Sequence, residues 1–160
     1  MDRATAFGDE LIRIHEHLRE TLDDLRDELD AGAVRGATRR SLQEHCVGFC
    51  AAITAHHTAE DRFAFPRLAA QYPELAPVLA ELEHDHQLVA GVLRGVDDLV
   101  SRLGEGDDPR LVRSGLDGLS AVLESHFRWE ERRIVVALNS MTPPGGAALE
   151  LFGPSTAGLD

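Results

Sequence analysis

The sequence is poor in several residue types and has no long apolar run, and two of these scarcities exclude a class of protein. It has 160 residues with two cysteines, one tryptophan, one tyrosine and no lysine. Cys46 and Cys50 are four positions apart, a spacing that forms neither a C-x-x-C redox motif nor a disulfide framework. Apolar runs such as Val47–Ile53 fall far short of the roughly 20 residues that span a bilayer. We interpret the cysteines as small buried hydrophobes and expect no membrane partner.

Positive charge is scarce as well. Sixteen basic residues, all of them arginine, stand against 28 acidic residues, so the net charge is −12. Binding to nucleic acid or to an anionic membrane surface needs clustered positive charge, and this composition argues against both partners. The first residues also lack the basic and apolar regions of a secretory signal. We therefore expect a cytoplasmic protein.

What the sequence does contain is helical periodicity. Apolar residues recur every three or four positions through four long stretches, and none alternates as a half-buried strand would. Pro66 is predicted to end or kink the second helix, and Asp108 is predicted to cap the fourth. Four helices with short connections predict an all-α fold, an antiparallel up-down four-helix bundle, over residues 1–140. Residues 141–160, rich in proline and glycine, are predicted to form a flexible C-terminal tail.

Six polar residues occupy steps of the apolar stripes that should face the core: His15, His56, Glu60, His86, His126 and Glu130. Burying unpaired imidazoles and carboxylates is costly. Each glutamate follows a histidine by four positions, so each such pair shares one helix face. The other two histidines lie early in the first and third helices, whereas the pairs lie late in the second and fourth. In an up-down bundle those positions are at the same end, so the six groups are predicted to meet in one layer.

The composition of this layer favours metal binding. Nitrogen and oxygen ligands without thiolates suit iron, manganese or zinc. Two carboxylates able to bridge, together with four imidazoles, fit two metal ions better than one, as in other dimetal centres of bundle cores. The alternative is a purely hydrogen-bonded polar layer, which is costly when only half satisfied.

The motifs resemble those of the hemerythrin-like, or HHE cation-binding, domain over about residues 5–140. They are His15-x-x-Leu-x-x-x-Leu, His56-x-x-x-Glu60-Asp61 running into Phe65-Pro66, His86-x-x-Val-x-x-x-Leu and His126-x-x-x-Glu130-Glu131. The resemblance implies a non-haem di-iron centre held by the six residues and bridged by an oxo or hydroxo group and two carboxylates, with manganese or zinc as lesser alternatives. It also implies a small-molecule ligand (O₂, peroxide or NO), in oxygen or iron sensing or in oxidative-stress defence. The alternative is a di-iron enzyme that decomposes peroxide or acts as an O₂-dependent oxidase, and the oligomeric state stays open.

One position departs from the family pattern. The family commonly carries His-x-x-x-His on its third helix, but here Ala90 stands four residues after His86. The resemblance then implies two imidazoles on each metal, with a position left for water or a second ligand on both. Periodicity ranks Glu130 above Glu131 as a ligand. Four flanking residues stay open as further members of the metal shell: Glu131, Asp61, His84 and His57.

Overall fold

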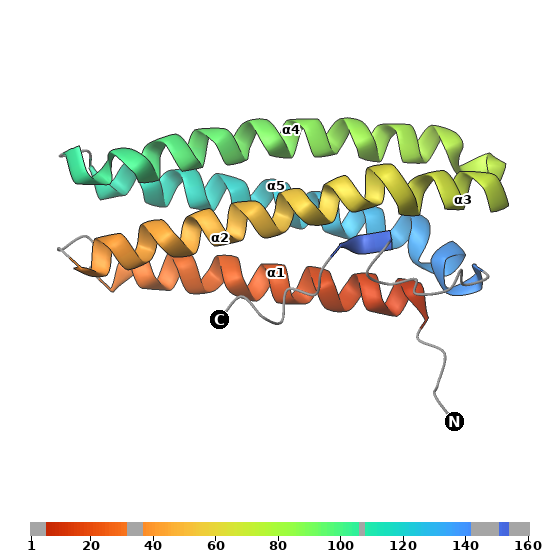
Figure 1. Ribbon diagram of the computed structural model, residues 1–160, viewed down its shortest axis with the longest axis horizontal. Coiled ribbons are helices and arrows are strands. Elements are labelled where there is room, and N and C mark those ends of the chain that lie inside the picture. Colours follow the sequence, from red (N-terminus) through yellow and green to blue (C-terminus); the bar gives the residue numbers. More distant parts are fainter. Residues whose placement is uncertain (1–5, 32–36, 106–107, 142–150, 154–160) are drawn as a thin grey trace, which may run out of the picture.

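The computed structural model describes residues 6–31, 37–105, 108–141 and 151–153. Four long helices lie side by side along the longest axis of the molecule (Figure 1): α1 (Phe7–Asp30), α2 (Ala37–Ala59), α4 (Ala76–Ser101) and α5 (Pro109–Ser140). Helix α1 packs against α2 and α5, and α4 packs against the same two helices. No strand occurs among the described residues. The predicted all-α fold is confirmed as a helical bundle.

The apolar stripes form the core that the periodicity predicts. In α1, for example, Leu11, Leu18 and Leu22 are at most 3% exposed, and burying one such side chain stabilises the fold by about 1.5–3 kcal/mol. Cys46 is buried, Cys50 is partly buried, and both are free thiols. None of the described helices combines the length and the apolar character needed to cross a membrane.

Pro66 does not end the second helix. A π-helical turn, η1 (Glu60–Ala64), follows α2 directly and leads into α3 (Phe65–Gln71). At its end the Phe65 N–H donates to the Glu60 carbonyl, five residues back instead of four. The regular α-helical hydrogen-bond pattern is therefore already interrupted at the position where Pro66 lacks an N–H donor. The helix ends at Tyr72 instead, whose φ of −131° is not helical and lies in the range favoured before a proline. A short 3₁₀ turn, η2 (Pro73–Leu75), then leads into α4.

The predicted cap of the last helix is present, because the Asp108 side chain accepts a hydrogen bond from the Arg110 N–H at 2.9 Å. The 3₁₀ turn η3 (Arg102–Glu105) ends the preceding helical stretch.

The expectation of a flexible tail does not hold for Leu151 and Phe152, which are at most 1% exposed. Gly153 follows them with a φ of +84°, and a Cβ there would lie 3.2 Å from the Ala55 carbonyl oxygen of α2. A glycine therefore allows this backbone to approach the helix closely. The apolar pair outweighs the proline- and glycine-rich composition on which the prediction rested. The rest of the expected tail, residues 142–150 and 154–160, lies outside the described residues.

Candidate metal centre

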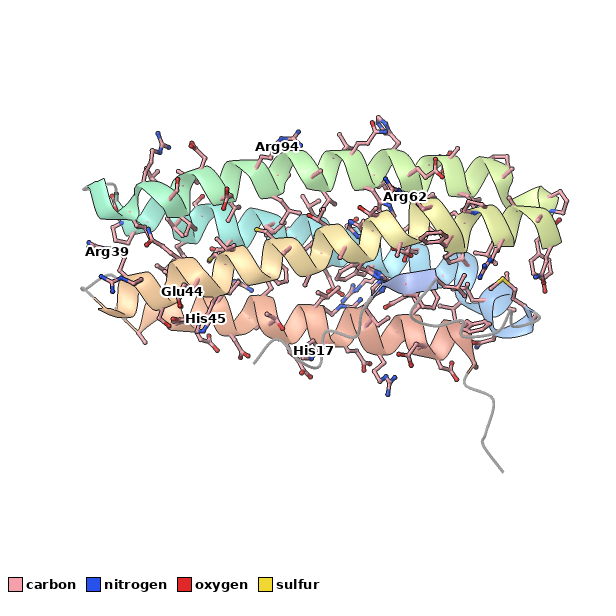
Figure 2. All side chains as sticks on the ribbon, in the orientation of Figure 1. His17, Arg39, Glu44, His45, Arg62 and Arg94 are labelled. Carbon is pink, nitrogen blue, oxygen red and sulfur yellow. The ribbon has the colours of Figure 1, made fainter. Side chains whose placement is uncertain are left out.

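All six residues predicted to share one polar layer are buried in the bundle. Their side chains come from all four long helices and from the π turn, and none is more than 5% exposed: His15, His56, Glu60, His86, His126 and Glu130. Two other histidines lie outside this layer. Figure 2 shows His17 and His45 on the outer faces of α1 and α2, and His45 is paired there with Glu28.

The two carboxylates lie between imidazoles of different helices. Glu130 Oε1 is 3.3 Å from His15 Nε2, and Glu130 Oε2 is 3.2 Å from His126 Nε2 and 3.6 Å from His86 Nε2. Glu60 Oε1 is 3.1 Å from His56 Nε2 and 3.6 Å from His86 Nε2. The Nε2 atoms of all four histidines thus face the two glutamates.

On the α1–α2 side, each imidazole is oriented through its other nitrogen. His15 Nδ1 donates to Glu131 Oε1 at 3.0 Å, and His56 Nδ1 donates to the backbone carbonyl of Phe152 at 3.0 Å. When Nδ1 carries the proton of a neutral ring, Nε2 presents a lone pair. The two Nε2 atoms are 3.4 Å apart, so two neutral rings would direct their lone pairs at each other. A proton on one of these nitrogens, or a metal ion bound to both, removes that repulsion.

On the α4–α5 side only one of the two imidazoles is held by a hydrogen bond. His86 Nδ1 donates to Asp61 Oδ1 at 2.7 Å, whereas His126 Nδ1 lies 3.6 Å from Asp85 Oδ2 and has no hydrogen-bond partner among the described residues. Metal-binding histidines usually hold an acceptor at the nitrogen that faces away from the metal, which fixes the tautomer and raises ligand basicity. Asp85 and the Phe152 carbonyl were not identified from the sequence.

Without a cation, the two buried carboxylates cannot both be charged. Burial raises the pKa of Glu60 well above its usual range, and the neighbouring Glu130 raises it further. Burial also acts to raise the pKa of Glu130, but the close imidazoles of His126, His15 and His86 outweigh it and hold that pKa well below its usual range. One carboxyl therefore binds a proton where a metal ion would allow both to ionise.

The pKa values of the imidazoles also shift in opposite directions. Burial lowers the pKa of His15 and His86, but hydrogen bonds to their carboxylate partners outweigh it, and the pKa of His86 rises to about 9. For His56 burial dominates, a positive charge on His15 adds to it, and the pKa falls to about 3. Protons thus supply part of the positive charge that the cluster requires.

Several buried donor and acceptor atoms have no hydrogen-bond partner, and they are of the kinds that bind a cation. They include both carboxylate oxygens of Glu60 and Glu130 and the Nε2 atoms of His86 and His126. Leaving such atoms unsatisfied costs about 1–3 kcal/mol each. Three sets of potential ligand atoms lie within 4.8 Å of one another: His15, His56 and Glu130; Glu60, His86 and Glu130; and His57, His86 and His126. The donor set and its geometry fit metal ions.

The four residues left open by the sequence fall into three groups. Glu131 and Asp61 contact the outer nitrogens of His15 and His86, and Arg19 additionally holds Glu131 at 3.2 Å. His84 is exposed. His57 is 5% exposed, and its ring stacks on that of His86 at 3.9 Å between centroids. Burial lowers the pKa of His57 well below its usual range, and the neighbouring imidazoles add to this effect.

Two hollows adjoin the centre. A cavity of about 190 Å³ is bordered by His57, Asp61, His86 and Ala90, so the position that departs from the family pattern does lie beside the cluster. A larger groove of about 930 Å³ runs between α4 and α5 and reaches His126.

Comparison with known proteins identifies the family. The model of the hemerythrin HHE cation binding domain matches residues 7–138. No match was found among curated proteins or among solved structures. The match spans most of the chain and all six clustered residues, and the family implies cation binding. The protein therefore belongs to the hemerythrin HHE cation-binding domain family.

Proposed function

We propose that this protein is a non-haem di-iron protein that binds O₂ or a related small oxidant such as peroxide or NO. The observation that carries the proposal is the convergence of four imidazole Nε2 atoms on two buried carboxylates that have no hydrogen-bond donor. Neutral imidazole and carboxylate together suit iron, and the absence of thiolate from the cluster argues against softer metals. The proposed ligands are His15, His56, Glu60, His86, His126 and Glu130.

The clusters suggest how the ligands divide between two metal ions. One cluster joins His15 and His56 with Glu130, and another joins Glu60 and His86 with the same Glu130. A carboxylate shared by two clusters is suited to bridge two ions. Glu60, which contacts imidazoles of both α2 and α4, is the second proposed bridge.

The connectivity we propose is the antiparallel up-down order of a four-helix bundle. In Figure 1 the colour gradient runs back and forth along the long axis from α1 to α5. That order places the early turns of α1 and α4 beside the late turns of α2 and α5, where the six ligands lie.

Iron in this site would supply an open coordination position and electrons for a small oxidant. The residues of the chain orient the ligands and keep bulk water away. Glu131 and Asp61 hold protons on the outer nitrogens of His15 and His86. The Phe127 ring stacks on His15 at 4.0 Å between centroids and covers that side of the centre with apolar surface.

Enzymatic turnover of peroxide is the second candidate, and the cavity beside Ala90 favours it. Its volume of about 190 Å³ exceeds the roughly 30 Å³ that one water occupies in the liquid. A molecule as small as peroxide can therefore approach His86 from that side.

The experiment is to load the protein with ferrous iron without oxygen and to titrate it with NO, followed by optical and EPR spectra. We expect a saturable iron–nitrosyl signal at no more than the iron concentration. Glu60→Gln should lose most of that signal together with the iron. The control Glu44→Gln, which changes an exposed residue of the preceding helix α2 (Figure 2), should not. Iron-loaded protein that gives no nitrosyl signal would contradict small-oxidant binding. Adding peroxide and measuring its consumption per iron distinguishes the enzyme from the binding protein.

A further inference from the structure

His57 has the features of a metal ligand although its position lies beside the apolar stripe. It follows His56 directly, is 5% exposed, and its Nε2 is buried without a hydrogen-bond partner. An imidazole buried for packing alone usually has its nitrogens satisfied. The unsatisfied nitrogen of His57, which lies among other potential ligand atoms, is therefore available to bind a metal ion.

The neighbours of His57 place it on the α4–α5 side of the centre. Potential ligand atoms of His57, His86 and His126 lie within 4.8 Å of one another. The His57 ring stacks on His86 with an interplanar angle of 9° and meets His126 edge-on at 5.2 Å between centroids. His56, one residue earlier, instead meets His15 of α1 at 5.4 Å. Adjacent histidines on α2 thus serve opposite halves of the cluster.

The cavity beside Ala90 explains why an imidazole is needed from α2. Ala90 lies one helical turn after His86 and has no donor atom, and the cavity at this position is bordered by His57 as well. Two stacked, parallel rings cannot both direct a nitrogen at one metal ion without one ring tilting. The cavity of about 190 Å³ gives the His57 ring room to tilt.

We infer that His57 is a fifth imidazole ligand, supplied by α2 to the metal ion held by His86 and His126, in the place where α4 carries Ala90. This inference rests on the proposed di-iron function and deepens it. It makes the two metal positions unequal, with three imidazoles on one ion and two on the other. The remaining open position would then be on the ion held by His15 and His56, and not beside Ala90, where the enzyme alternative brings peroxide to His86.

The test compares iron retention and Mössbauer spectra of the wild type with those of His57→Ala. The control is His45→Ala, which removes an exposed histidine from the same helix. In the wild type we expect two iron signals of equal intensity from two unequal sites. In His57→Ala we expect one of these signals to shift or disappear while the other stays, and a chelator to remove that iron at least about tenfold faster. His45→Ala should match the wild type in both measurements.

A rescue experiment separates ligation from packing. His57→Ala combined with Ala90→His returns an imidazole to the same cavity from α4, so it should restore both iron signals and slow iron release. His57→Ala combined with Ala90→Leu refills the volume without a donor nitrogen and should not. Equal rescue by leucine and histidine would show that His57 acts by packing and would overturn the inference.

Two further outcomes keep the inference separate from the proposed function. If His57→Ala does not fold, as judged by circular dichroism, His57→Gln keeps most of the volume while it removes the ring, and the same comparison applies. Unchanged spectra and chelator rates in a folded His57 variant would overturn the inference and leave the di-iron function standing. A wild type that holds no iron would refute the proposed function itself.

Discussion

The backbone carbonyl of Phe152 accepts a hydrogen bond from Nδ1 of His56 at 3.0 Å, although the two residues are 96 positions apart. This bond fixes the tautomer that directs His56 Nε2 toward Glu60 and His15. A residue near the C-terminus thereby orients a proposed ligand near the middle of the chain.

The first prediction follows from this bond. Truncation after residue 150 removes the carbonyl and the buried Phe152 ring, so iron should be lost to a chelator about 10–100-fold faster. The truncated protein should also be less stable by about 3–5 kcal/mol, the usual cost of removing a buried phenylalanine side chain. Chemical unfolding of the metal-free protein measures the second effect separately from the first.

Phe152→Leu is the matched control for the truncation, because it keeps the carbonyl and most of the apolar surface. It should hold iron nearly as the full chain does, with only a modest loss of stability. Iron release as slow in the truncated protein as in Phe152→Leu would show that the hydrogen bond to His56 does not matter for the centre.

The second prediction concerns Glu60 in the metal-free protein. Burial and the neighbouring Glu130 raise its pKa well above the usual range, which favours the neutral, protonated carboxyl. Glu60→Gln, a neutral side chain of the same shape, should therefore change the Tm of the metal-free protein by only a few degrees. It should abolish most of the rise in Tm that iron causes in the wild type, because a bridging carboxylate is lost. Calorimetry measures the Tm of both proteins with and without iron. An equal iron-induced rise in Tm in Glu60→Gln would contradict the assignment of Glu60 as a metal ligand.

The third prediction concerns protons released by metal binding. In the metal-free protein, burial opposes protonation of His86, but Asp61 and Glu130 outweigh it and raise the pKa to about 9. A raised pKa means that the proton is bound at neutral pH, and a metal ion must displace it from Nε2. Glu60 and His15, whose pKa values are also raised, should lose protons as well, so binding should release more than about one proton per chain at pH 7.

The pH dependence has a definite sign. Below pH 9, metal affinity should fall as pH falls, by about tenfold per pH unit for each proton displaced. Titration calorimetry in buffers of different ionisation enthalpy counts the protons. Asp61→Asn removes the charge that raises the His86 pKa, so it should reduce the number released. A proton count near zero at pH 7 would contradict the electrostatics described for this cluster.

The sequence predicts much of this centre because the decisive signals are local. His56 and Glu60 are one helical turn apart, as are His126 and Glu130, and periodicity alone places them on the core side of their helices. Their burial in the structure agrees with that prediction.

Other parts of the site depend on tertiary contacts that leave no local signal. Phe152 contributes a backbone carbonyl, which any residue possesses, so no side-chain pattern identifies it. His57 lies about 100° around the helix from His56, beside the apolar stripe, and only the packing of α2 between α1 and α4 brings it into the cluster. The π turn at Glu60–Ala64 also changes the backbone hydrogen bonding just before Pro66. This is why the proline, which was predicted to end or kink the helix, does not end it.

The central claim is that the buried imidazoles and carboxylates hold two iron ions. The most direct measurement is elemental analysis of the protein after expression in iron-replete medium, together with its optical spectrum in air. We expect about two iron ions per chain and near-ultraviolet charge-transfer bands typical of paired ferric ions with imidazole ligands. Less than half a metal ion per chain, with no such bands, would contradict the account.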